Sequence, residues 1–160
     1  MITMLRFALL FFACVCIGCG PADGIERVPI TGLLTVQGKP LPGATLSFTP
    51  VGETAGPGAI GRSDAEGKFE VISSRERHEG IPPGEYTVRV SLFVMPDGTP
   101  LPPEVPQADA PRSRQSVPPP FSSPNSPLKV VIPKEGGAVK VDIPAKLLIP
   151  LKSPSTKSGQ

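Results

Sequence analysis

The chain has 160 residues, with 16 lysines and arginines against 14 aspartates and glutamates, so its formal charge at pH 7 is only +2. So close a balance gives no electrostatic footprint for nucleic acid or anionic lipid. The 23 prolines and 17 glycines argue against long helices. The composition therefore predicts one all-β domain, whose core must use Val, Ile, Leu and Phe because the chain has no Trp and one Tyr.

The first residues, 1–18, have the pattern of a secretory signal peptide. One cation, Arg6, precedes an apolar run at 7–18, and small residues stand before a candidate cleavage point. The run is shorter than the about 20 apolar residues that a transmembrane helix needs. Export is therefore the prediction, with an uncleaved membrane anchor as the alternative.

All three cysteines, Cys14, Cys16 and Cys19, lie within the first 19 residues. Residues 17–19 resemble the end of a bacterial lipobox, although Cys16 stands where that motif usually has leucine. The resemblance implies lipidation at Cys19, in preference to Cys14 or Cys16, with residues 19–27 as a lipid-anchored tether. Gly20 resembles the residue that follows the cysteine in outer-membrane lipoproteins of Gram-negative bacteria. Beyond Cys19 no cysteine remains for an intramolecular disulfide, so the hydrophobic core must stabilise the fold.

Short segments of alternating apolar and polar residues, separated by Gly and Pro turns, follow the tether. In the strand predicted at 86–94, for example, Tyr86 and Val88 face one side and Thr87 and Arg89 the other. The last two segments flank a turn at 134–137 and predict a terminal hairpin. The predicted strands are 28–36, 44–50, 59–62, 68–72, 86–94, 128–132 and 138–143.

A proline-rich segment interrupts this series. Residues 95–127 contain eleven prolines, which predict an extended, solvated loop. Residues 145–160 end in Lys, Ser and Pro and predict a disordered tail. The domain is therefore expected at 28–144, as seven short strands in two packed sheets.

Three segments, 32–44, 63–69 and 80–88, together resemble the carboxypeptidase regulatory-like domain of the transthyretin-like (prealbumin-like) group. The likeness covers roughly residues 28–94 and implies a seven-stranded antiparallel β-sandwich with the proline-rich segment as an insert. Together with the signal, it resembles small exported lipoproteins of planctomycete-type bacteria. Within these segments Asp64 and Gly67 are expected to form a tight turn. Gly84 and the Tyr86 hydroxyl are expected to hold the corner before the 86–94 strand.

Candidate catalytic and metal-binding residues are few. Asp64 and Glu66 supply two carboxylates, whereas Ca²⁺ takes 6–8 oxygen ligands, which favours a structural turn. His78 is the only histidine, and zinc needs three or four N, S or O ligands, so His78 is expected in a solvated loop with Arg75 and Arg77. A Ser–His–acid triad around His78 is the remaining catalytic alternative, without a nucleophile-elbow motif to support it. No catalytic, metal-binding or cofactor-binding residue is therefore assigned, and no cofactor is expected.

Related sandwiches include two enzyme classes, whose residue inventories do not match this chain. Hydroxyisourate hydrolases use several histidines and a carboxy-terminal Tyr-Arg-Gly-Ser, and intradiol dioxygenases bind iron with two tyrosines and two histidines. This chain has one tyrosine and one histidine. The function expected is a non-catalytic structural or protein-interaction module of the cell envelope. The alternative is a carbohydrate-binding module, for which Tyr86, Phe93 and Phe121 are the candidate aromatics. Expected partners are membrane lipid through acylated Cys19 and an envelope protein or glycan, without nucleic acid.

Overall fold

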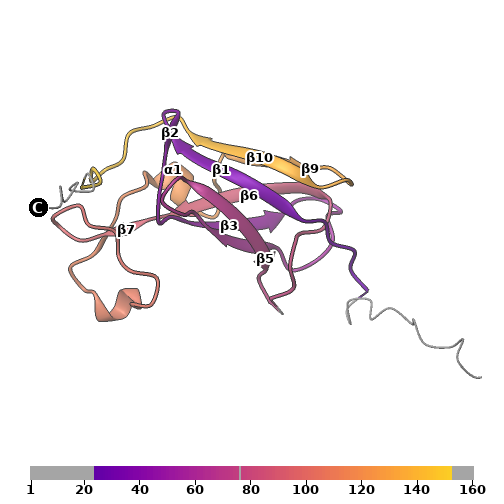
Figure 1. Ribbon diagram of the computed structural model, residues 1–160, viewed down its shortest axis with the longest axis horizontal. Coiled ribbons are helices and arrows are strands. Elements are labelled where there is room, and N and C mark those ends of the chain that lie inside the picture. The colour runs from indigo at the N-terminus through magenta and orange to yellow at the C-terminus, as the bar shows by residue number, and fades with distance from the viewer. Residues whose placement is uncertain (1–23, 76, 153–160) are drawn as a thin grey trace, which may run out of the picture.

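The computed structural model describes residues 24–75 and 77–152 (Figure 1). The predicted signal, the three cysteines and residues 153–160 lie outside the described residues. The described chain is all-β, apart from a 3₁₀ turn η1 (Gln107–Asp109) and the short helix α1 (Pro119–Ser122). Nowhere in this part of the chain is a helix long and apolar enough to cross a membrane.

Strands form at each position where the alternation predicts one, although the last residues of the 86–94 segment pair elsewhere as a separate short strand. Two short pairings, through β2 (Lys39–Pro40) and through β7 (Phe93–Val94) with β8 (Arg114–Gln115), have no counterpart among the predictions. The strands are β1 (Ile30–Val36), β2 (Lys39–Pro40), β3 (Thr45–Pro50), β4 (Ala59–Arg62), β5 (Lys68–Ser73), β6 (Gly84–Ser91), β7 (Phe93–Val94), β8 (Arg114–Gln115), β9 (Lys129–Ile132) and β10 (Gly137–Ile143).

One curled sheet contains eight of these strands, in the order β10-β1-β5-β4-β3-β6-β9, with β2 paired to β1. The prediction of a purely antiparallel fold is wrong at one place, because β1 and β10 pair in parallel, Ile30 opposite Gly137 and Val36 opposite Ile143. Parallel pairing requires a long connection between the two strands, and here that connection is nearly the whole domain.

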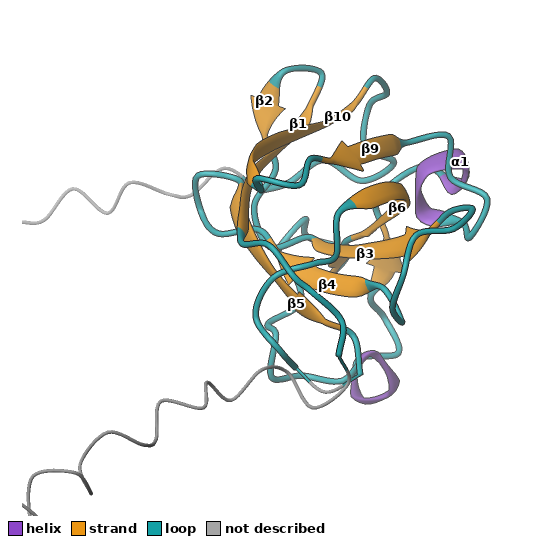
Figure 2. Ribbon diagram, turned by 90° about the vertical axis from the view of Figure 1, so that its right-hand side faces the viewer, coloured by secondary structure: helices purple, strands orange, loops and turns teal. Residues whose placement is uncertain are grey.

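The bend of the sheet lies at β5. The first half of this strand pairs with β1, with Phe69 opposite Gly32. Its second half pairs with β4, with Val71 opposite Gly61. Because β5 changes partner along its length, the two parts of the sheet fold over one another, as Figure 2 shows.

The predicted terminal hairpin is wrong. Its two strands are present as β9 and β10, but β9 pairs with β6 and β10 pairs with β1, at opposite edges of the sheet. The curl brings these edges close enough to contact each other (Figure 2). The turn between them, closed by the Gly136 N–H donating to the Pro133 carbonyl at 3.1 Å, therefore joins two edges of one sheet.

The core lies between the facing parts of the curled sheet and follows the predicted alternation. Leu46 on β3 and Val88 and Val90 on β6 are fully buried, as is Leu34 on β1. Phe48 contacts Phe69 with ring centroids 6.0 Å apart and Tyr86 in an edge-on arrangement at 6.3 Å. This hydrophobic cluster of the described residues thus joins side chains from both parts of the sheet.

The corner at the start of β6 has the predicted arrangement. Gly84 has φ +147°, a conformation that side chains rarely adopt. Two residues later the buried Tyr86 hydroxyl donates to the Pro82 carbonyl at 2.8 Å. Tyr86 therefore packs in the core with its ring while its hydroxyl fixes the preceding turn.

The proline-rich segment 95–127 is not the extended, solvated loop that its composition predicts. Val117 is fully buried in the core cluster, and Phe121 on α1 packs against it. Gln115 Oε1 accepts the backbone N–H groups of Leu92 at 2.9 Å and of Val117 at 3.2 Å. Prolines prevent this segment from joining the interior of a sheet. Its apolar side chains are nevertheless buried, and side-chain oxygens accept hydrogen bonds from its backbone N–H groups.

The tail also differs from the prediction up to residue 152. The Leu148 N–H donates to the Ser116 carbonyl at 2.7 Å, and the Ser116 hydroxyl donates to the Ile149 carbonyl at 2.6 Å. The Lys152 N–H donates to the Gly98 carbonyl at 3.0 Å. Hydrogen bonds therefore hold residues 145–152 against the proline-rich segment, and alternate apolar side chains of this stretch pack against the core cluster.

Candidate functional site

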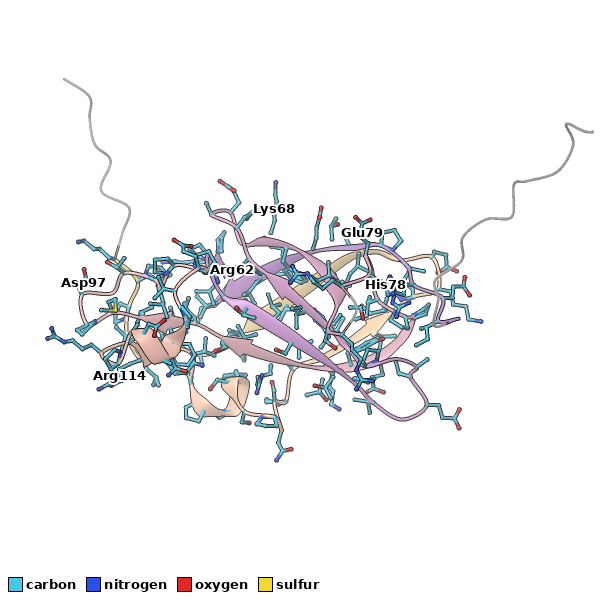
Figure 3. The ribbon with its side chains drawn as sticks, turned by 90° about the horizontal axis from the view of Figure 1, so that it is seen from below. Arg62, Lys68, His78, Glu79, Asp97 and Arg114 are labelled. Atoms are coloured by element: carbon cyan, nitrogen blue, oxygen red, sulfur yellow. The ribbon has the colours of Figure 1, made fainter. Side chains whose placement is uncertain are left out.

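The titratable side chains labelled in Figure 3 are spread over the molecule. Asp97 and Arg114 lie at one end, His78 and Glu79 at the other, and Arg62 and Lys68 between them (Figure 3). Within the described residues, no group of three or more His, Cys, Asp or Glu is placed to hold a metal ion. The candidate binding sites are therefore the depressions in the outer faces of the sheet.

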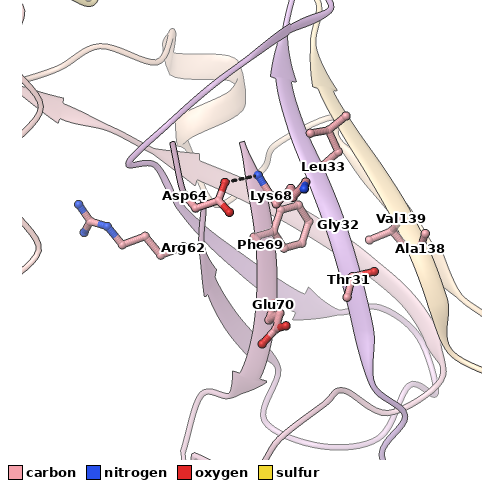
Figure 4. Close-up of a pocket in the computed structure, with 10 residues that line it drawn as sticks. All are labelled: Thr31, Gly32, Leu33, Arg62, Asp64, Lys68, Phe69, Glu70, Ala138 and Val139. Atoms are coloured by element: carbon pink, nitrogen blue, oxygen red, sulfur yellow. Dashed lines mark hydrogen bonds between the residues drawn. The ribbon is translucent and has the colours of Figure 1, made fainter. Parts of the chain in front are cut away.

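The β1 depression is a broad hollow with a volume of about 600 Å³. It carries charges of both signs: Arg62 and Lys68 against Asp64 and Glu70. Figure 4 shows Asp64 beside Lys68, with the Arg62 side chain pointing away from them. Its lining is Thr31, Gly32, Leu33, Arg62, Asp64, Lys68, Phe69, Glu70, Ala138 and Val139.

Asp64 in this depression is committed to the turn between β4 and β5. Its Oδ1 atom accepts the backbone N–H of Glu66 at 3.0 Å. It also accepts the backbone N–H of Lys68 at 2.8 Å, the bond drawn in Figure 4. The Gly67 N–H donates to the Asp64 carbonyl at 3.1 Å, and Gly67 has φ +77°. The predicted structural turn is confirmed, and its carboxylate is occupied by backbone donors.

The arginine cleft, of about 280 Å³, lies between the outer face of β3 and β6 and the loop 101–107. It contains two cations and no acidic side chain. Hydroxyl groups line its floor and apolar residues its rim. The lining is Gly43, Thr45, Ser47, Arg62, Arg89, Ser91, Phe93, Leu101, Pro102, Pro103, Val105 and Gln107.

Strand register determines how the floor of the arginine cleft is arranged. Thr45 on β3 lies opposite Arg62 on β4 and Ser91 on β6. The next outward residue of β3, Ser47, lies opposite Arg89. Because directly opposed residues share a face, these five side chains form a polar surface on the outside of the sheet.

The rim of the arginine cleft is held by hydrogen bonds to the sheet. The Leu101 N–H donates to the Phe93 carbonyl at 2.8 Å, and the Arg62 guanidinium donates to the Leu101 carbonyl at 3.3 Å. The Val105 N–H donates to the Pro102 carbonyl at 3.1 Å and closes a turn. Three prolines at 102, 103 and 106 restrict the backbone further, so the rim is preorganised.

The Ser91 hydroxyl on the floor of the arginine cleft is held by a hydrogen bond from a neighbouring side chain. The Gln115 amide nitrogen donates to the Ser91 hydroxyl at 2.9 Å. The same side chain accepts two backbone N–H groups through its oxygen. Gln115 therefore orients Ser91 towards the cleft side of the sheet while tying the proline-rich segment to the end of β6.

Two carboxyl groups with lowered pKa values are bound to nearby donors. The pKa of Asp142 is lowered most by the hydrogen bond from the Thr35 hydroxyl, and next by the hydrogen bond from the Gly38 N–H at 2.9 Å. The backbone N–H of Thr99, then its hydroxyl, lower the pKa of Asp97. Each donor stabilises the charged form of its carboxylate. Asp142 thus links β10 to the turn after β1, and Asp97 closes the turn after β7.

Tyr86 is the third group with a shifted pKa. Burial raises its pKa to about 12, against a smaller opposing effect of the Arg27 charge. A neutral hydroxyl that donates to a buried carbonyl serves structure rather than proton transfer near neutral pH.

The residues singled out in the sequence do not come together in one site. Cys19 lies outside the described residues, and His78 is half-buried at the end away from Asp97 and Arg114 and does not line the arginine cleft. Tyr86 is fully buried, which corrects its candidacy as an exposed sugar-binding aromatic. Phe121 is half-buried against the core, and Phe93 alone of the three aromatics lines the arginine cleft.

Sequence reasoning missed the arginine cleft. The alternation of β6 placed Arg89 and Ser91 on the outward face, and that was the available local signal. The rim comes from residues 101–107, which are far from β3 in the sequence and are distinguished there only by proline content. These residues reach the sheet only through the tertiary fold.

A scan against models of protein families finds no matching family, and searches of curated proteins and of solved structures find no match.

Proposed function

We propose that the protein is a non-catalytic module of the cell envelope, exported and attached to membrane lipid through acylated Cys19. The lipobox-like residues 17–19 and the short apolar run before them support the anchor. Gly20 favours the outer membrane. The partners are membrane lipid and an envelope protein or glycan, and the nearly balanced charge argues against nucleic acid.

The observation that carries the proposal is the position of the groups with shifted pKa values. In catalytic sites such groups gather in a cleft, where they act on a substrate. Here Tyr86, Asp97 and Asp142 lie apart, and each uses its polar atoms to fix a turn or a strand end. Their perturbation has a structural cause, which favours a scaffold over a catalyst.

The fold is further proposed to be the transthyretin-like β-sandwich of the carboxypeptidase regulatory-like domain. Support comes from the Asp64 turn and from the Gly84–Tyr86 corner, which lie in two of the three segments that resemble that domain. The change of partner along β5 supports a division into two packed layers. The parallel pairing of β1 with β10 completes one of these layers.

Carbohydrate binding is the second candidate function, and the arginine cleft favours it. The cleft combines hydroxyl and amide side chains with one half-buried aromatic ring, Phe93, on a preorganised rim. Small-ligand sites combine a few convergent polar groups with an apolar lining in this way. A glycan array probed with the protein separates this candidate from a purely protein-binding role.

Intact-mass measurement of the protein from the membrane fraction tests the anchor. We expect a mature chain that starts at Cys19 and carries acyl mass. Cys19→Ser should abolish that mass and release the protein, whereas Cys14→Ser, the matched control outside residues 16–19, should leave it unchanged. A water-soluble mature wild-type protein without acyl mass would refute the anchor.

A pull-down from envelope extract, using the lipidated protein as bait, tests the interaction role. A specific partner that is retained by the wild type, and lost when an exposed surface residue is changed, supports a protein-interaction module. Binding on the glycan array without any protein partner would favour the carbohydrate alternative instead.

A further inference from the structure

We propose that the arginine cleft binds a saccharide that carries a carboxylate, such as a uronic acid unit, and that Arg89 contacts that carboxylate. The inference rests on the carbohydrate-binding candidate above and deepens it by naming the ligand class and the residue. It does not depend on the lipid anchor.

The charge of the cleft is the first argument. Arg89 is exposed on the outward face of β6, and neither Arg89 nor Arg62 forms an ion pair within residues 24–75 and 77–152. The one acid on the rim loop, Glu104, is not among the residues that line the cleft. A guanidinium presents a planar pair of donors that matches a carboxylate in a bidentate arrangement. The cleft therefore has an unneutralised anion-binding group facing solvent.

The two arginines have different roles because their partners differ. Arg62 donates to the Leu101 carbonyl and so helps to hold the rim. Strand spacing and rise place its Cα about 12 Å from that of Arg89, diagonally across β3. The space between them is filled by the Thr45 and Ser47 side chains. Arg89 is thus the free cation at one side of a hydroxyl-lined floor.

The neutral lining favours a sugar as the carrier of the carboxylate. Thr45, Ser47 and Ser91 offer hydroxyls, and the Gln107 amide offers both a donor and an acceptor. Phe93 and Leu101 supply apolar surface for the C–H face of a ring. The volume of about 280 Å³ lies just below the about 300–1,000 Å³ usual for small-ligand sites, and this size suits a single sugar unit.

A free inorganic anion fits less well. Compact phosphate sites surround the ion with converging backbone N–H groups. Here β3 is an inner strand, hydrogen-bonded to β4 on one side and β6 on the other, so its backbone donors are already engaged. A ligand on the floor of the cleft therefore contacts only side chains there. Of the two cations, Arg62 is already hydrogen-bonded to the rim.

Isothermal titration calorimetry with the whole lipidated protein in detergent tests the inference. The probes are trigalacturonate, the uncharged galactose trisaccharide and inorganic phosphate. We expect trigalacturonate to bind at least ten-fold more tightly than the other two, with affinity falling as salt is raised. Equal binding of phosphate would overturn the saccharide assignment, and equal binding of the neutral trisaccharide would overturn the role of the carboxylate.

Variants at position 89 locate the site. Arg89→Gln should weaken trigalacturonate binding at least ten-fold, and Arg89→Lys should fall between it and the wild type because it keeps the charge but loses the bidentate fork. Arg75→Gln removes the same charge from an exposed loop residue and should leave affinity unchanged. Thermal melting of each variant separates lost binding from lost folding.

Failure of this inference and failure of the carbohydrate candidate give different results. If a glycan array detects binding that Arg89→Gln leaves intact, the cleft assignment is wrong while carbohydrate binding stands. If the array and the titration of a folded protein both detect no sugar, both are wrong.

Discussion

The ring of Phe69 lies over Gly32 on the neighbouring strand, in the space that a β-carbon at position 32 would occupy. Phe69 is 3 % exposed and contacts Phe48 in the core. Gly61, on the other side of β5, also lies against Phe69 and Val71. A large ring on β5 is therefore accommodated by a glycine on each adjacent strand, at the place where the sheet bends.

Gly32→Ala should destabilise the protein, since the added methyl group overlaps the Phe69 ring in a close-packed core. Overpacking of this kind typically costs about 1–3 kcal/mol. Urea unfolding measures the change. Thr31→Ala, on the same strand but exposed, is the control and should change the free energy of unfolding by less than about 0.5 kcal/mol. Equal stability of Gly32→Ala and the wild type would contradict the packing described.

Gly84 is expected to tolerate no side chain. A β-carbon there would lie 2.5 Å from the Thr54 side chain, whose hydroxyl accepts the Glu85 N–H at 3.0 Å. Gly84→Val should therefore lower the melting temperature clearly, and Gly84→Ala should lower it as well. Gly137→Ala separates backbone strain from the clash, because Gly137 has φ +120° and a β-carbon added to it would meet nothing within 4 Å. Equal losses in the two alanine variants would mean that the Thr54 contact contributes nothing.

The single tyrosine makes its own pKa measurable by absorbance. Spectrophotometric titration of the folded protein should give a midpoint of about 12 for Tyr86, and the unfolded chain should give about 10. Because the folded pKa is the higher one, this group supports stability fully below pH 10 and loses its contribution as the pH rises from about 10 through about 12. A midpoint near 10 in the native protein would exclude the buried position.

Tyr86→Phe should cost about 1–3 kcal/mol, because it leaves the Pro82 carbonyl without its buried donor. In the variant, stability should also fall less steeply at alkaline pH, because there is no Tyr86 hydroxyl left to ionise. Melting temperatures of both proteins between pH 7 and pH 11 provide the measurement. Parallel curves across that range would show that ionisation of Tyr86 is not linked to unfolding.

Asp142→Asn is expected to weaken the junction of β10 with the turn after β1. The Thr35 and Gly38 donors lower the pKa of this carboxyl in the folded state, so its contribution is present above the unfolded pKa near 3.9 and is lost as the pH falls below it. The melting temperatures of wild type and variant should therefore differ at pH 7 and converge in acid. Asp109→Asn, in the exposed turn η1, serves as the charge-matched control and should leave stability unchanged.

Several features of the fold followed from short stretches of sequence. Alternation located β3, β5 and β6 and identified Leu46, Phe69 and Val88 as inward residues. Turn chemistry identified Asp64 and Tyr86 in their structural roles. These features depend on residues within a few positions of one another, where the period of two and the hydrogen-bonding capacity of single side chains decide the outcome.

Strand partners, the burial of the proline-rich segment and the arginine cleft were decided only by the tertiary structure. β9 and β10 follow each other with the signals of a hairpin, yet each pairs with an earlier strand because the curled sheet offers them two free edges. Val117 is buried although prolines surround it, and Leu101 approaches Arg62 across the chain. The sequence by itself determined where the longer strands and the turns around Asp64 and Tyr86 form, since those depend on local periodicity and turn chemistry. Which strands pair, and which loop forms the rim of the arginine cleft, depend on the packing of segments distant in the sequence, and no local pattern encodes that.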